Sequence, residues 1–310
     1  MQKKRKFNPS AAIHIYQKTL DGAVIFYTLY DLLAYITRLS VNARKYGITV
    51  LLICPMFDHI HILTLQKTLD QLCRFVGRTT SEFVLAYNED CGRKGPLFSP
   101  RFGSSIKKID KEKRACIAYL ANNAPEKKLV ARCEDYRWNL IAYATCDHPY
   151  SDKIVLRKAS RQLRSNLNQV DRCLEREEPL GYKHLKRMFR GLARKEREQL
   201  IDYILSRYSP IDYDLLISFY GNYRNMLVAI NANNGHEYEI KEEYNVDSHE
   251  AYKEMLRKVA AHGGEIKDVL TMSFGQKIAL TGELLCETTA TPEQVRKFLH
   301  LKKAPADIFP

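Results

Sequence analysis

The fold of this 310-residue chain is decided by the stretch from Ile48 to Leu65, which has the sequence ITVLLICPMFDHIHILTL. The apolar, β-branched run before Pro55 and the run after Asp58 predict two strands joined by a short turn. Residues two apart in a strand point to the same face. His59 and His61 would therefore stand side by side on the second strand.

This histidine pair admits two interpretations. For an arbitrary His-x-His pattern, the common one is two polar residues on the wetter face of a strand. Here Ile60 and Ile62 cover the opposite face and Leu63 continues the histidine face, which predicts a well-buried strand. A buried imidazole needs a polar partner, and a metal ion is one that imidazole commonly binds. The pair then lacks a third ligand and a reactive group.

The elements around this hairpin predict an α+β fold. Residues 12–18 predict a strand, residues 29–45 a helix, and a helix capped by Thr68 or Asp70 runs to about Tyr87. Residues 96–102 predict a short edge strand around Pro100. The order β-α-β-β-α-β is that of a ferredoxin-like antiparallel sheet, with both helices on one face and the other face left open for the histidines.

A further predicted helix supplies what the histidines lack. It starts near Asp110 and ends before Pro125, and it carries Tyr119 and Asn123 four residues apart. Side chains at this spacing lie on one helix face. If the helix packs on the histidine face, Asn123 would be a third metal ligand and Tyr119 a nucleophile. The alternative for Asn123 is a residue near the helix end that bonds the backbone.

Composition and charge point to a globular protein with a polyanionic partner. The chain is 45% hydrophobic and carries a net charge of +13, of which residues 1–150 contribute +10, residues 151–200 contribute +7 and residues 201–310 contribute −4. Nucleic acid fits this balance, and a solvated helical surface is the alternative. No signal peptide, membrane span or Cys-x-x-Cys pair is apparent, which predicts a cytoplasmic, nucleoid-associated protein without a zinc finger.

The sequence predicts two parts. Residues 1–150 form the sheet domain, and residues 151–310 form a mostly α-helical C-terminal region rich in Arg and Lys at its start. Near 277–300, two short helical segments are separated by a tight break before Thr291 and Pro292, a good helix start. They suggest a helix-turn-helix, and two ordinary packed helices are the alternative.

The ordered motifs resemble a known family. The chain is similar to single-tyrosine HUH transposases, and among these to the REP-associated tyrosine transposases. The resemblance covers about residues 12–143. It rests on the first strand with its Asp21-Gly22 turn, His59-Ile60-His61, the segment 96–102, Tyr119 followed by Asn123, and Tyr136-Arg137-Trp138.

The resemblance implies cleavage and strand transfer of single-stranded, hairpin-forming DNA by a monomer or homodimer. Tyr119 would attack the phosphate and form a 5′-phosphotyrosine intermediate. His59, His61 and Asn123 would hold a divalent metal, magnesium or manganese. The DNA contacts would be Arg101, Lys107, Lys108, Lys111 and Lys113.

Two departures from the family pattern keep other functions open. Phe57 and Asp58 stand where the family has Pro-Asn before the first histidine, and Ala124 stands where it has Pro after Asn123. A regulator that binds DNA without cutting it is one alternative. A metal-dependent nuclease that uses water, with Tyr119 purely structural, is another.

Overall fold

The predicted antiparallel sheet is present in the computed structural model, which describes residues 7–232 and 248–302. Its strands pair in the order β2-β3-β1-β4, and every pair is antiparallel, as in a ferredoxin-like sheet. The predicted fold class is confirmed. The elements of this half are β1 (Ala12–Lys18), η1 (Leu20–Gly22), α1 (Leu29–Lys45), β2 (Thr49–Pro55), β3 (His59–Leu65), α2 (Leu69–Cys91), β4 (Gly103–Lys107) and α3 (Asp110–Glu126).

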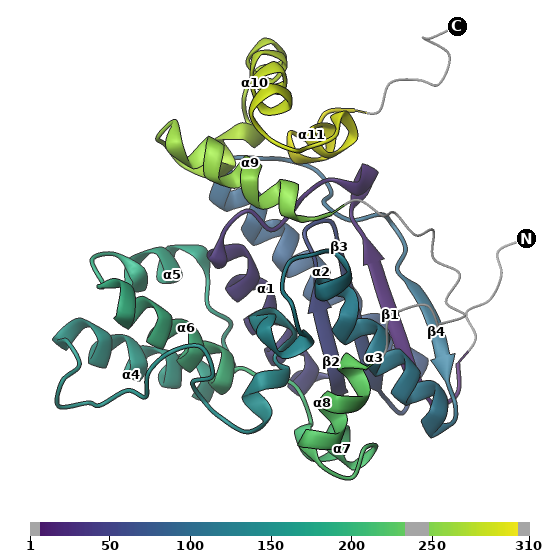
Figure 1. Cartoon of the computed structure of the whole chain (residues 1–310). Helices are drawn as coiled ribbons and strands as arrows, with labels where there is room; N and C mark the ends of the chain where they lie inside the picture. The colour runs from purple at the N-terminus through teal and green to yellow at the C-terminus, as the bar shows by residue number, and fades with distance from the viewer. Residues whose placement is uncertain (1–6, 233–247, 303–310) are drawn as a thin grey trace, which may run out of the picture.

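The two faces of the sheet carry different helices. α1 and α2 pack together on one face, where Gln17 of β1 donates a hydrogen bond from Nε2 to Oγ1 of Thr80 in α2 (2.8 Å). Side chains alternate along a strand, so His14 and Tyr16 point the other way, toward α3. α3 crosses that face in Figure 1 and contacts β2, β3 and β4. The histidine face is therefore covered by α3 and is not open.

The helices over the sheet begin where the sequence offers side-chain caps. The Thr28 hydroxyl accepts a hydrogen bond from the Asp31 amide, and the Asp31 carboxylate accepts one from the Thr28 amide. Thr68 caps α2 in the same way. α2 runs one turn beyond its predicted end and stops at Gly92, whose φ of +65° is the left-handed conformation that favours glycine at a helix end.

The edge strand lies a few residues later than predicted. β4 starts at Gly103, whereas Phe98 within the predicted strand forms only an isolated bridge with Thr19. The ring of Tyr16 lies over Gly103, its partner on β1, so closely that a Cβ there would be 1.8 Å from the ring. The sequence GSSIK has no apolar alternation, and it becomes a strand because β1 offers it a pairing edge.

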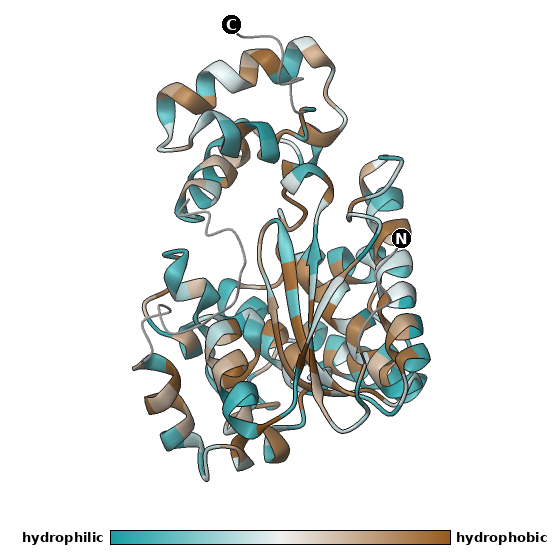
Figure 2. Cartoon of the chain, turned by 90° about the vertical axis from the view of Figure 1, so that its right-hand side faces the viewer, coloured by the Kyte–Doolittle hydropathy of each residue, from teal (hydrophilic) through white to brown (hydrophobic). Residues whose placement is uncertain are grey.

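Within residues 131–232 and 248–302 the chain is mostly helical and packs back on the sheet domain. Asn122 of α3 donates from Nδ2 to the Ile230 carbonyl in the helix Tyr223–Asn231 (2.8 Å), and the Tyr27 hydroxyl donates to the Phe298 carbonyl in the helix Pro292–Phe298. Figure 2 shows helices on both sides of the sheet. The elements are η2 (Cys133–Asp135), η3 (Arg137–Asn139), η4 (Ile141–Ala144), α4 (Arg161–Glu175), α5 (Tyr182–Phe189), α6 (Arg194–Arg207), α7 (Tyr213–Ser218), α8 (Tyr223–Asn231), α9 (Glu250–Ala261), η5 (Ile266–Leu270), α10 (Phe274–Glu287) and α11 (Pro292–Phe298).

The predicted break between two helices near 277–300 is the one that separates α10 from α11. Arg296 of α11 donates from Nη2 to the Asp21 carbonyl (2.7 Å), so this helix lies against the sheet domain. The division of the chain at residue 150 and a DNA-reading role for α10 and α11 stay predictions. No helix within residues 7–232 and 248–302 is both long and apolar enough to cross a bilayer.

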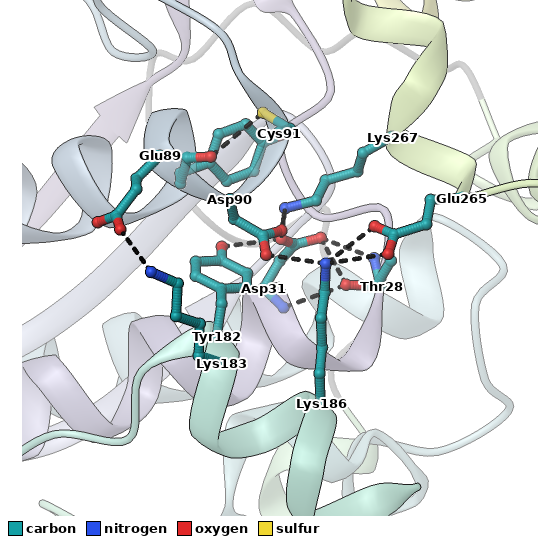
Figure 3. A network of polar contacts seen from close by, with 11 residues as sticks. Thr28, Asp31, Glu89, Asp90, Cys91, Tyr182, Lys183, Lys186, Glu265 and Lys267 are labelled. Carbon is teal, nitrogen blue, oxygen red and sulfur yellow. Dashed lines mark hydrogen bonds and ion pairs between the residues drawn. The ribbon is translucent and has the colours of Figure 1, made fainter.

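An ion network fastens the C-terminal region to the sheet domain (Figure 3). Lys267 of η5 is almost fully buried and binds Asp31 Oδ1 of α1 (2.9 Å) and Asp90 Oδ2 of α2 (2.6 Å). Lys186 of α5 binds the second Asp90 oxygen at 2.9 Å, and the Tyr182 hydroxyl donates to Asp31 Oδ1 (2.8 Å). Four elements that are distant in sequence thus meet around two carboxylates.

Candidate active site

Three histidines and one tyrosine gather between the sheet and α3. The ring of His61 on β3 lies 4.9 Å from the ring of His59 and 5.0 Å from the ring of His14 on β1, measured between centroids. The ring of Tyr119 lies 5.6 Å from His61 and 6.1 Å from His14. His14, His61 and Tyr119 are 1%, 2% and 7% exposed. The fold therefore places a phenol against imidazoles that water scarcely reaches.

The strand register and the helix position explain this meeting. Tyr16 of β1 stands opposite His61 of β3, and His14 therefore lies diagonally across from it on the same face. Tyr119 is in the middle of α3, within the buried run from Cys116 to Ala124. That run is buried because the helix lies between the sheet on one side and α8 on the other. The fold thus brings His59, His61 and Tyr119 together, and Asn123 lies one helical turn after Tyr119 on α3.

Each histidine of the pair uses its Nδ1 atom on a neighbour. His59 Nδ1 lies 2.7 Å from Asp58 Oδ1, and a carboxylate accepts, so the imidazole donates there and in the neutral ring Nε2 keeps the lone pair. His61 Nδ1 lies 2.9 Å from His14 Nε2. With the shared proton on His61, its Nε2 likewise keeps the lone pair. This His61 Nε2 is buried and has no hydrogen-bond partner in the described part of the chain.

Burial keeps the inner imidazoles neutral. It lowers the pKa of His14 to about 3, with a further contribution from Lys107, and it lowers the pKa of His61 well below the ordinary value, with help from the His59 ring. Neutral imidazole is the form that binds metals. The group is therefore ready to bind a cation at neutral pH without releasing a proton from these two rings.

A fourth histidine reaches the site from the C-terminal region. His249, which precedes α9, is 4% exposed, and its Nε2 lies 3.8 Å from Asp58 Oδ1. Burial lowers the pKa of His249 to about 3 despite the nearby carboxylate. Burial on its own would raise the pKa of Asp58, but His59 and His249 outweigh it and hold the pKa below its usual range. Asp58 is thus an anion held between two imidazoles.

The side chains at the site do not by themselves provide a complete set of metal ligands. Asn123 donates from Nδ2 to the Tyr119 carbonyl one turn earlier (3.0 Å), and its Oδ1 takes no part in that bond. Among the described residues, no three His, Cys, Asp or Glu side chains are grouped so as to hold a metal ion. His61 Nε2 is the nitrogen of the pair that is buried without a hydrogen-bond partner among the described residues, so it is the atom that a ligand would have to satisfy.

The five predicted DNA contacts lie just before β4, on its end and on the first turns of α3: Arg101, Lys107, Lys108, Lys111 and Lys113. Three of them are exposed. Lys107 is half-buried and close enough to lower the pKa of His14. Lys113 is already engaged, because it binds Asp110 Oδ1 (3.0 Å) and lies 5.4 Å from the Phe219 ring. Their contact with DNA stays a prediction.

Three residues of this site, Asp58, His14 and His249, lie outside the sequence motifs. Asp58 was noticed only as a departure from the family pattern, although a carboxylate directly before a histidine is a local signal for an orienting partner. His14 stands in an alternating strand segment, AIHIYQK, and could have been tested as a same-face residue. His249 has no local signal, because only the tertiary fold brings it to Asp58.

Comparison with known proteins adds one likeness of fold. No family model matches the chain, and no curated protein is similar to it in sequence. Among solved structures, a REP-associated tyrosine transposase bound to a REP hairpin is similar, with a TM-score of 0.40 and 15% sequence identity. The match covers 52% of this chain and 95% of that one. At these values, function must be argued from the residues of this chain.

Proposed function

We propose that this chain cuts and rejoins single-stranded DNA through a covalent intermediate on Tyr119. The observation that carries the proposal is the Tyr119 ring lying 5.6 Å from the His61 ring, inside a group of neutral, buried imidazoles. Nucleotidyl transfer depends on positioning a nucleophile beside groups that stabilise charge on the phosphate. Here the nucleophile comes from α3 and the stabilising groups come from the sheet.

The reaction balances without an external energy source. The Tyr119 oxygen bonds to phosphorus, the bond from phosphorus to the 3′ oxygen breaks, and the phenol proton ends on the released 3′-hydroxyl. The phosphodiester energy is kept in the 5′-phosphotyrosine link. Attack by a 3′-hydroxyl on that link reverses the step and joins two strands. The reference pKa of a tyrosine side chain in water is about 10, so a positive charge beside the Tyr119 oxygen would favour its ionised form.

His59, His61 and Asn123 would hold a magnesium or manganese ion. Such an ion supplies Lewis acidity toward a phosphate oxygen. The two histidines offer Nε2, and Asn123 offers its amide oxygen. Asp58 would be a positioning residue because its carboxylate accepts the Nδ1 proton of His59, and His14 would be one with its Nε2 accepting the Nδ1 proton of His61.

The DNA partner would be a single strand with hairpin-forming sequence. Its backbone would run past the cations near β4 and the start of α3: Arg101, Lys107, Lys108, Lys111 and Lys113. Such contacts make binding fall steeply as salt rises. The chain would act as a monomer or a homodimer.

A gel assay tests the proposal. The full-length protein is incubated with 5′- and 3′-labelled hairpin oligonucleotides and magnesium, and the products are separated under denaturing conditions. We expect a protein-linked band that carries the label downstream of the cut. Tyr119→Phe should abolish this band, and chelation with EDTA should abolish it in the wild type.

The matched control is Tyr16→Phe. Tyr16 lies on the same face, with its ring 5.9 Å from His14, so it is a second candidate nucleophile beside the histidines. This variant should keep the protein-linked band. A band that survives Tyr119→Phe but not Tyr16→Phe would assign the nucleophile to Tyr16. Free ends without linked protein would favour water as the nucleophile, and binding without any product would favour a regulator.

A further inference from the structure

We infer that a second surface of this protein binds the phosphate backbone of duplex DNA. It is formed by seven cations where three helices meet, and we call it the basic corner: Arg157, Lys158, Arg161, Arg164, Arg187, Arg190 and Arg194. It belongs to the bundle of α4, α5 and α6, which lies beside the sheet domain in Figure 1. The inference is independent of the function proposed for Tyr119.

Backbone contacts bring these cations to one place. Gln162 in the first turn of α4 donates from Nε2 to the Arg190 carbonyl at the end of α5 (2.5 Å). Ser160, the cap of α4, donates from its amide and its hydroxyl to the Glu196 carboxylate in the first turn of α6 (2.7 and 2.8 Å). The start of α4, the end of α5 and the start of α6 therefore form a single corner.

The corner is held rigidly by a small apolar core. Leu163 of α4, Phe189 of α5 and Leu200 of α6 are completely buried. Gly191 makes the turn between α5 and α6 with a φ of +76°, which favours glycine. Arg197 serves the fold, because its guanidinium donates to the Phe189 carbonyl (3.1 Å). The seven cations thus project from fixed backbone positions.

These cations are not used inside the protein. All seven are exposed, and none forms an ion pair within the described residues. Other cations of the same bundle are paired: Lys183 with Glu89, Lys186 with Asp90, and Lys195 with Asp152. The carboxylates of α4 lie at its opposite end. Seven unpaired positive charges at one corner attract a polyanion.

The chemistry of the corner favours duplex over single-stranded DNA. Six of the seven cations are arginines, whose planar guanidinium groups bind phosphate oxygens in pairs. Proteins that bind single strands add exposed aromatic rings on which bases stack. The segments 153–164 and 187–195 contain one aromatic residue, Phe189, and it is buried. The corner can therefore grip a backbone but offers no stacking platform for unpaired bases.

Two of the arginines, Arg161 and Arg194, lie at the N-termini of helices. α4 starts with Arg161, and α6 starts with Arg194 and Lys195. The helix dipole favours anions at a helix start and disfavours cations there. At these positions the cations do not stabilise their own helices through the helix dipole. An external phosphate backbone would compensate for both helix starts at once.

Binding of a labelled, blunt 20-base-pair DNA duplex without hairpin sequence tests the inference. The full chain is titrated by fluorescence anisotropy from 50 to 300 mM salt. Arg161→Gln/Arg190→Gln should weaken binding roughly tenfold and reduce the slope of log Kd against log salt by about 2. Arg161→Gln removes a cation that the dipole disfavours, so circular dichroism should show an unchanged fold.

The matched control is Arg172→Gln/Arg176→Gln. These arginines are exposed at the opposite end of α4, beside Asp171 and Glu175, and the variant loses the same charge. It should bind the duplex within about twofold of the wild type. Equal weakening by both variants would overturn the inference, because it would mean a diffuse charge effect. Tighter binding of duplex RNA than of duplex DNA would overturn it as well, and so would a loss of single-strand binding in Arg161→Gln/Arg190→Gln that exceeds the loss of duplex binding.

Tyr119→Phe separates this inference from the proposed catalytic function. It leaves the basic corner untouched and should bind the duplex like the wild type, even if it forms no covalent product. A wild-type protein that cuts hairpin DNA but does not bind the plain duplex would contradict the basic corner and leave the catalytic proposal standing.

Discussion

Two buried polar groups of this protein differ in how completely their atoms are partnered. In the ion network (Figure 3), Lys267 lies between Asp31 and Asp90 and close to two tyrosine rings, so every charge faces an opposite one. At the histidine face, His61 Nε2 and His249 Nδ1 are buried without any hydrogen-bond partner in the described residues. Asp90 Oδ2 also lacks a hydrogen bond of good geometry, but it lies 2.6 Å from the Lys267 ammonium, whereas the two histidine nitrogens face no opposite charge at that distance among these residues.

The difference separates a structural group from a site. A buried polar atom without a partner loses its bonds to water and gains nothing in return, at a cost of about 1–3 kcal/mol. A ligand that supplies the missing bond would offset this cost. The ion network needs no ligand and serves to join α1, α2, α5 and η5. The histidine face needs one, which supports its assignment as the site.

Removing the central cation of the network should have the largest effect on stability. Lys267→Met keeps the aliphatic stem between Tyr87 and Tyr182 but leaves Asp31 and Asp90 short of a positive charge. We expect a loss of about 3–5 kcal/mol in the free energy of unfolding, measured with urea at pH 7.

The control for this prediction is Lys183→Met, because Lys183 pairs with Glu89 in full contact with solvent. An exposed pair contributes about 0–1 kcal/mol, so the midpoint of unfolding should hardly change. If Lys267→Met were as mild as Lys183→Met, the network would not be the device that fastens the C-terminal region.

Elements with local sequence signals could be predicted from the sequence, whereas groups assembled from distant segments could not. α1 and the β2–β3 hairpin were predictable because periodicity and caps are local, as at Thr28 and Asp31. The edge strand was misplaced because β4 depends on its partner β1, where Gly103 admits the Tyr16 ring. The two polar groups combine residues from distant segments, so no local pattern could give either the Lys267 network or the approach of His249.

Acid should affect the histidine face before the rest of the fold. Burial lowers the pKa of His14 and His249 to about 3, whereas in the unfolded chain both bind protons near 6.5. Above pH 6.5 both histidines are neutral in the folded and the unfolded chain, and the folded chain has its full stability. As the pH falls from 6.5 toward 3, protons bind these histidines in the unfolded chain only, so the free energy of unfolding decreases. We expect about 1.4 kcal/mol per pH unit for each residue, or roughly 2 kcal/mol each at pH 5.

Urea unfolding at pH 7 and pH 5 measures this loss. His249→Gln should reduce the change in the free energy of unfolding per pH unit by the contribution of one histidine, about 1.4 kcal/mol. His262→Gln is the control, because His262 is exposed at the end of α9. Parallel slopes for His249→Gln and the wild type would show that His249 takes up its proton in the folded protein as well.

Loss of the orienting carboxylate should weaken cation binding more than it weakens the fold. Asp58→Asn keeps the shape but no longer selects the Nδ1–H form of His59. Removing such an orienting partner reduces metal affinity about 10–100-fold. Titration calorimetry with Mn²⁺ measures the change, and Asp110→Asn, which alters a carboxylate at the start of α3, is the control. Equal Mn²⁺ affinity in the wild type and Asp58→Asn would remove Asp58 from the site.

The smallest change in stability should come from the atom that has no partner. His61→Leu removes an unsatisfied buried nitrogen and gains apolar burial, while it leaves His14 Nε2 without its bond. These effects oppose each other, and we expect a net change in the free energy of unfolding within about 1 kcal/mol.

The control is Leu63→Ala, two residues along the same strand. This variant should cost about 2–5 kcal/mol, because Leu63 is fully buried. The same His61→Leu protein should no longer bind Mn²⁺. A loss above about 2 kcal/mol for His61→Leu would mean that the imidazole stabilises the folded chain on its own, and the contrast between a completed network and an incomplete site would fail.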